Sequence, residues 1–85
     1  MSVPATDTRT TSLRARIDEI DDAILDLWRE RAAISREVGR ARLADGGTRL
    51  VLSREREILA RFSAALGEDG AQLALLLLRA GRGPL

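Results

Sequence analysis

The sequence predicts an all-α fold in which a three-helix protomer, with one long N-terminal helix, pairs with a second copy in an antiparallel helical homodimer. Three observations support this prediction. Apolar residues from Leu13 to Ala41 recur at alternating steps of four and three, as on one face of a helix. Glycine-containing breaks divide the rest of the chain into two shorter segments. These segments are too short to cover the long helix, so a second copy is needed beside it.

The composition limits the kinds of site that the chain can hold. Its 85 residues make one small domain, which alone buries only about 60% of its unfolded surface. Cysteine and histidine are absent, so we expect no disulfide and no metal site, and a reducing, cytoplasmic location fits. A net charge of +1 and two aromatic residues argue against nucleic acid as a partner. The apolar run 73–80 is too short to span a membrane, and no signal peptide is evident.

All fourteen basic residues are arginine. Arginine binds carboxylates and phosphates through two parallel hydrogen bonds, and it keeps its charge when buried. A GC-rich genome is the simpler explanation for the missing lysines. It does not explain where the arginines lie.

The first helix is predicted from about Ser12 to Leu43, with Thr11 or Ser12 as its N-cap. Residues 1–10 are expected to form a disordered tail ahead of a single helical domain, residues 11–85. The helix spans roughly 48 Å at about 1.5 Å per residue. Its apolar face, called the seam below, consists of Leu13, Ile17, Ile20, Ile24, Leu27, Ile34, Val38 and Ala41.

Charge is distributed unevenly along this helix. Residues 12–27 carry five acidic and two basic residues, a net charge of −3, whereas residues 28–43 carry two acidic and five basic residues, a net charge of +3. The helix dipole alone favours this distribution, and an antiparallel partner would also align opposite charges. Arg36 and Arg40, taken singly, are interpreted as solvated charges.

The second half of the chain predicts two further helices. Asp45-Gly46-Gly47 is a strong helix stop, after which a helix should run from an N-cap at Ser53 to Leu66 and end at Gly67. The third helix should begin near Asp69. Its run of leucines predicts a helix that is buried on every side. Residues 81–85 are expected to form a mobile tail that cannot stay helical.

Arg31 occupies a seam position at which the spacing calls for an apolar residue. A guanidinium group is disfavoured in a core unless it meets an anion, although it can also extend to solvent at the edge of a seam. Arg42 lies about 16 Å further along the same face, and Arg54-Glu55 lie at the positive end of the second helix. Arg14 is roughly 25 Å from Arg31, so only a partner chain could bring it to the same ligand.

These residues predict a site for a small anion that is completed across a dimer interface. The chain has no evident nucleophile–base pair and no phosphate-binding glycine loop. Fixed positive charge suits a reaction without proton transfer, in which a polyanion is held in a reactive conformation while charge develops on one oxygen.

Four motifs follow one another along the chain: Leu13-Arg14-x-x-Ile17-Asp18-x-Ile20-Asp21, Arg31, Val38-Gly39-x-Ala41-Arg42 and Ser53-Arg54-Glu55-Arg56. This ordered set resembles the all-helical AroQ class of chorismate mutases, over about residues 12–82. The segments 46–51 and 75–83 are most similar to the short actinobacterial delta subclass.

The resemblance implies an intertwined three-helix dimer with two active sites. It implies the cofactor-free pericyclic rearrangement of chorismate to prephenate, in phenylalanine and tyrosine biosynthesis. By position, Arg31 and Arg14 of the partner subunit would bind the substrate carboxylates, and Arg42 would approach the ether oxygen. Arg54 matches a further cation of the site, and Glu55 matches the acceptor for the substrate hydroxyl.

Two departures from the family pattern imply a low intrinsic efficiency. Val51 stands where efficient relatives have an acidic residue, and the third helix lacks the usual glutamine that helps hold the ether oxygen. The subclass implies a mutase that is weak alone and is activated by binding DAHP synthase. Arg82 and the tail residues Gly83, Pro84 and Leu85 are candidates for closing the site in that complex; a disordered chain end is the alternative.

Two other functions remain open from the sequence. A non-catalytic helical dimer could dock on a partner enzyme and regulate it. Isochorismate pyruvate lyase is an alternative enzyme on the same scaffold.

Overall fold

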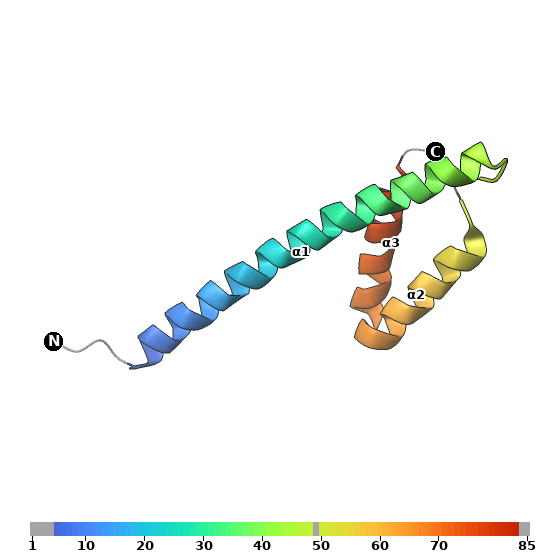
Figure 1. Cartoon of the computed structure of the whole chain (residues 1–85). Coiled ribbons are helices and arrows are strands. Elements are labelled where there is room, and N and C mark those ends of the chain that lie inside the picture. The colour runs from blue at the N-terminus through green and yellow to red at the C-terminus, as the bar shows by residue number, and fades with distance from the viewer. Residues whose placement is uncertain (1–4, 49, 84–85) are drawn as a thin grey trace.

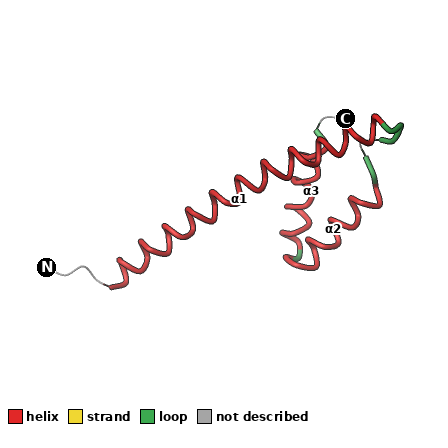
Figure 2. The backbone as a smooth tube through the Cα atoms, viewed as in Figure 1, coloured by secondary structure: helices red, strands yellow, loops and turns green. Residues whose placement is uncertain are grey.

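The computed structural model describes residues 5–48 and 50–83, which form three helices in the order α1 (Ala5–Ala44), α2 (Leu52–Leu66) and α3 (Glu68–Arg82). No strand occurs in these two ranges, and loops occupy the short connections between the helices and the end of α3 (Figure 2). The predicted all-α, three-helix protomer with a long first helix is therefore confirmed.

Helix α1 begins at Ala5 and not at the predicted Ser12. Residues 5–10, predicted as part of a disordered tail, are therefore helical, while residues 1–4 lie outside the described residues. The physical reason is that residues 5–11 contain neither glycine nor proline, so no residue interrupts the helix there. At the other end, α1 stops at Ala44, directly before the predicted Asp45-Gly46-Gly47 break.

Helices α2 and α3 are joined by a single residue, Gly67, which has a φ of 67°. This left-handed conformation favours glycine, and it reverses the chain so that the two helices form a hairpin. The predicted end of the second helix at Gly67 is confirmed. The predicted N-cap at Ser53 is wrong, because the backbone is extended at Val51 and the carbonyl of Val51 accepts the first helical bond, 3.1 Å from the Glu55 amide nitrogen.

Helix α3 packs against both α2 and α1. Figure 1 shows α2 following the loop at the end of α1, and α3 returning to the C-terminal half of α1. Gly81 lies buried at this crossing, where a Cβ atom would collide with the Ser35 side chain. Glycine at this position therefore allows the end of α3 to approach α1 closely.

The end of α3 differs from the predicted mobile tail. Gly81 and Arg82 belong to the helix, and Gly83 caps it by donating its amide hydrogen to the Arg79 carbonyl at 3.0 Å. Packing against α1 supplies contacts that a glycine-rich segment lacks on its own. Pro84 and Leu85, the rest of the predicted tail, lie outside the described residues.

A single chain buries very little apolar surface. Among the described residues the buried apolar side chains are Ala32, Ile58 and Ala74, and no large side chain is fully buried. The prediction that the third helix is buried on every side is wrong for the single chain, because Leu75 is 51% exposed and Leu76 is 43% exposed. The residues available in one chain cannot surround this helix.

The seam of α1 is also uncovered. Its large side chains are between 42% and 62% exposed. The N-terminal half of α1 extends away from the α2–α3 hairpin (Figure 1). The radius of gyration is 18.7 Å, whereas a compact chain of this length would have about 12 Å. Apolar surface of this extent in one chain indicates an interaction surface.

Candidate active site

A cavity of about 980 Å³ lies between the C-terminal half of α1, the beginning of α2 and the end of α3. Its apolar walls come from Leu27, Ile34, Val38, Leu43, Val51, Ile58 and Leu78. Its charged lining comes from Glu30, Arg31, Arg36, Arg40, Arg42, Arg54, Glu55 and Arg82. The volume and the mixture of apolar and polar groups are typical of a site for a small organic molecule.

The cavity is strongly cationic. Six arginines and two glutamates line it, a net formal charge of +4, whereas the whole chain carries only +1. Charge of one sign around a concave surface with apolar walls raises the local concentration of oppositely charged ligands. The cavity is therefore suited to a small polyanion that also has an apolar framework.

Arg31 is directed towards α3 and is half-buried. Its Nη1 donates a hydrogen bond to the Leu77 carbonyl oxygen at 3.3 Å. A guanidinium group has five N–H donors in a planar fork, so this bond leaves others to bind an anion in the cavity. The seam position that calls for an apolar residue is thus used to bring a cation to the wall of the cavity.

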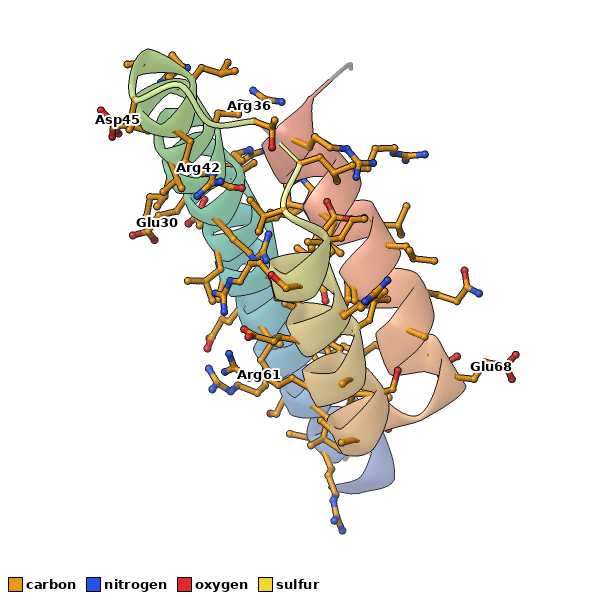
Figure 3. The ribbon with its side chains drawn as sticks, turned by 90° about the vertical axis from the view of Figure 1, so that its right-hand side faces the viewer. Glu30, Arg36, Arg42, Asp45, Arg61 and Glu68 are labelled. Atoms are coloured by element: carbon orange, nitrogen blue, oxygen red, sulfur yellow. The ribbon has the colours of Figure 1, made fainter. Side chains whose placement is uncertain are left out.

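Arg42 lies on α1 beside the loop that leads to α2 (Figure 3). Its Nε donates a hydrogen bond to the Thr48 carbonyl at 3.1 Å, and its own carbonyl accepts one from the Gly47 amide at 2.7 Å. The turn after α1 therefore folds back onto this residue. These two bonds tie Arg42 to the loop that carries Val51 into the cavity wall.

Arg54 and Glu55 lie in the first turn of α2 and face different surroundings. Arg54 lines the cavity and forms an exposed ion pair with Glu57, with an Nη1–Oε2 distance of 3.4 Å. The Glu55 carboxylate instead faces α3, where the Arg82 Nη1 lies 3.2 Å from its Oε1 and 3.0 Å from its Oε2. Glu55, the predicted acceptor for the substrate hydroxyl, is therefore paired with a cation from α3.

Arg14 is the one predicted site residue of the described part of the chain that does not line the cavity. It lies on the N-terminal half of α1, which extends away from α2 and α3 (Figure 1). Gly83 of the predicted tail does line the cavity, whereas Pro84 and Leu85 are outside the described residues.

Several lining residues were not predicted from the sequence. Arg36 and Arg40, interpreted as solvated charges, line the cavity together with Ser35. Arg36 also donates from Nε to the Ala80 carbonyl at 3.2 Å, and Figure 3 shows its side chain near the end of α3. These placements depend on where α3 crosses α1, which helical periodicity does not specify.

The sequence indicates which helices form the Glu55–Arg82 pair but does not indicate the partner residue. Two antiparallel helices joined by a tight turn bring residues at equal separations from the turn close together. Glu55 lies twelve residues before Gly67, and the residue twelve after it is Arg79, whereas Arg82 lies fifteen after it. The spacing therefore directs Glu55 to the last turn of α3, and the packing of the hairpin selects Arg82 as its partner.

Comparison with known proteins identifies the family to which the chain belongs. Residues 13–77 match the family described as chorismate mutase type II, which is well over half of the chain. The chain belongs to this family. It is 53% identical over 83 residues to the intracellular chorismate mutases of Mycobacterium tuberculosis and Mycobacterium bovis, which covers 98% of this chain and 74% of each relative. The chorismate mutase family resemblance predicted from the motifs is therefore confirmed.

Two further relatives support the assignment. The intracellular chorismate mutase of Mycolicibacterium smegmatis is 51% identical over 73 residues, or 86% of this chain and 70% of the relative. A chain in a solved complex of DAHP synthase and chorismate mutase from Corynebacterium glutamicum, with a bound transition state analog, superposes with a TM-score of 0.90. It is 43% identical and covers 96% of this chain and 99% of its own length.

Replacing Arg31 by leucine should change the free energy of unfolding by less than about 1 kcal/mol, because an apolar side chain that continues the seam offsets the lost hydrogen bond to the Leu77 carbonyl. Thermal unfolding at a fixed protein concentration measures the change. Arg29→Leu on the exposed surface of α1 is the control; its ion pair with Asp26 has side chains that are 72% and 80% exposed. A marked loss of stability in Arg31→Leu alone would show that Arg31 is retained for folding.

Proposed function

We propose that the protein is a chorismate mutase that rearranges chorismate to prephenate, without a cofactor, in phenylalanine and tyrosine biosynthesis. The observation that carries the proposal is the cationic cavity with apolar walls in a chain of the chorismate mutase type II family. Chorismate has two carboxylates on an apolar ring framework. A cavity with a net charge of +4 and a wall of aliphatic side chains complements both properties.

The reaction requires binding and electrostatics, and it requires no proton transfer. We propose that Arg31 and Arg14 of the partner subunit hold the two carboxylates and fold the substrate into its reactive conformation. Arg42 then stabilises the negative charge that grows on the ether oxygen as the C–O bond breaks and the new C–C bond forms. Arg54 adds positive charge, and Glu55 accepts a hydrogen bond from the substrate hydroxyl.

The protein is proposed to act as an antiparallel homodimer. The exposed seam of α1 provides the apolar surface to be buried, and the opposite charges of the two halves of α1 align in an antiparallel pair. Because Arg14 lies far from the cavity of its own chain, the dimer also supplies the missing cation. Among the described residues, no helix has the length and apolar character needed to cross a membrane. The relatives named intracellular support the proposed cytoplasmic location.

DAHP synthase is the proposed partner. The C. glutamicum structure supports this proposal, because that chorismate mutase is in a non-covalent complex with DAHP synthase. Val51 in the cavity wall, in place of an acidic residue, supports weak catalysis by the isolated dimer. Binding of the partner would then raise turnover by stabilising the productive arrangement of the site.

Consumption of chorismate by the isolated protein, with and without the DAHP synthase of the same organism, tests the function directly. We expect slow turnover alone and a rise of roughly tenfold or more with the partner, which corresponds to an activation free energy lower by about 1.4 kcal/mol or more. The absence of turnover in both cases would favour a non-catalytic regulatory dimer. Pyruvate release from isochorismate, with no prephenate from chorismate, would favour the lyase.

Arg42→Ala should lower kcat by about 10²–10³-fold, or roughly 3–4 kcal/mol, because the charge developing on the ether oxygen loses its stabilising cation. Steady-state kinetics of the complex with DAHP synthase measures the loss. Arg61→Ala is the matched control, since Arg61 is an exposed arginine of α2 outside the cavity lining. Unchanged turnover in a stable, dimeric Arg42→Ala protein would contradict the assigned role.

Mixed dimers test whether the site is shared between subunits. Neither Arg14→Ala nor Arg31→Ala homodimers contain a complete site, but a mixed dimer has one site in which both arginines are present. Equimolar exchange should restore about a quarter of the wild-type activity, because half of the dimers are mixed and half of their sites are intact.

The control for this exchange mixes Arg14→Ala with the doubly substituted chain, a combination that contains no complete site. A failure to recover activity after verified subunit exchange would contradict a shared site. Equal recovery in the control mixture would contradict it as well.

A further inference from the structure

The ion pair between Glu55 and Arg82 differs from the other ion pairs of the described residues. The Glu55 and Arg82 side chains are only 21% and 25% exposed, whereas every other ion pair in the described ranges joins side chains that are at least 66% exposed. Both residues line the cavity. This contact therefore belongs to the site and is shielded from solvent, unlike a surface pair.

The geometry leaves Glu55 able to accept a further hydrogen bond. A single nitrogen, the Arg82 Nη1, lies 3.0 Å and 3.2 Å from the two carboxylate oxygens. An ionised carboxylate has about four lone-pair positions, so acceptor capacity remains for a ligand in the cavity. Arg82 can thus fix the orientation of the carboxylate without replacing a substrate hydroxyl.

The Arg82 head group depends on this pair for its own position. Its Nε is buried and has no hydrogen-bond partner within the described residues. The backbone that carries Arg82 is held firmly, because Arg31 and Arg36 bind the carbonyls of Leu77 and Ala80 in the last turns of α3. The end of α3 therefore presents one cation to Glu55 from a fixed direction.

We propose that Arg82 is a positioning residue, which orients the Glu55 carboxylate as the acceptor for the substrate hydroxyl. This inference builds on the proposed function. Arg82 acts through Glu55, so removing Arg82 should matter only while residue 55 carries a carboxylate. Such dependence distinguishes positioning from a general structural contribution by the end of α3.

A double-mutant cycle tests the proposal in the complex with DAHP synthase. We expect Arg82→Ala to lower kcat/KM for chorismate by about tenfold, and by less than about twofold when Glu55→Gln is already present. Arg82→Lys should restore part of the loss, because a cation again faces Glu55. Arg79→Ala is the matched control: Arg79 is an exposed arginine in the last turn of the same helix, and its loss should leave kcat/KM unchanged.

Thermal unfolding of each variant checks that it folds. If Arg82→Ala does not fold, the same cycle is measured with Arg82→Gln, which keeps hydrogen-bond donors and removes the charge. Calorimetric affinities for a transition-state analogue that carries the hydroxyl provide the same comparison without turnover, and they should show the same dependence on Glu55.

Three results would overturn the inference. Equal losses from Arg82→Ala in the two backgrounds would make Arg82 a structural residue, and a gain in activity would make its contact with Glu55 inhibitory. A wild-type protein that turns over no chorismate and binds no analogue would instead overturn the proposed function, and the inference with it. An active wild type with additive variants would leave that function intact and overturn only the role of Arg82.

Discussion

The crowding of guanidinium groups around one cavity is the constraint on which the rest of the structure depends. Six arginines with like charge repel one another, and two glutamates offset only part of this repulsion. A protein that is nearly neutral overall has no general need for such a cluster. This repulsion destabilises the empty site. A small polyanion bound in the cavity would offset it, because the anion places opposite charge close to the guanidinium groups.

The fold is arranged to support this cluster. Helix α1 is long enough to present its C-terminal half to the cavity while its N-terminal half extends beyond the hairpin of α2 and α3. The hairpin turns at a single glycine and returns to α1, where Gly81 permits a close approach and two arginines bind the carbonyls of the last turns. The apolar surface left exposed is the surface that the proposed second copy would bury. Stability and completion of the site then depend on the same association.

The sequence predicted the helices well where a regular apolar spacing or a glycine determines the local backbone. The spacing of the seam predicted α1, and the stops at residues 45–47 and 67 placed its end and the hairpin turn. The start of α1 was missed because the threonine-rich segment carries no clear start signal. The end of α3 was missed because Gly81 and Arg82 owe their helical conformation to packing against α1, which is a tertiary contact.

The site was less predictable than the fold. Arg31 could be singled out because it breaks an apolar pattern, and helical spacing placed Arg42 on the same face. Arg54 and Glu55 were indicated by their position near the start of the second helix, and the family resemblance added a role for each. Arg36 and Arg40 break no pattern, so only the crossing of α3 over α1 identifies them as lining residues. Arg82 is a different case, since the spacing about Gly67 directs Glu55 to the last turn of α3 but matches it with Arg79, so only the packing of the hairpin identifies Arg82 as its partner.

A crystal structure of the isolated protein with a dianionic transition-state analogue tests the central claim most directly. In each cavity the analogue should lie against Arg31 and Arg42 of one subunit, and Arg14 of the partner subunit should bind one of its carboxylates. An analogue bound by one subunit alone, with Arg14 of both copies in solvent, would contradict a site that is completed by dimerisation.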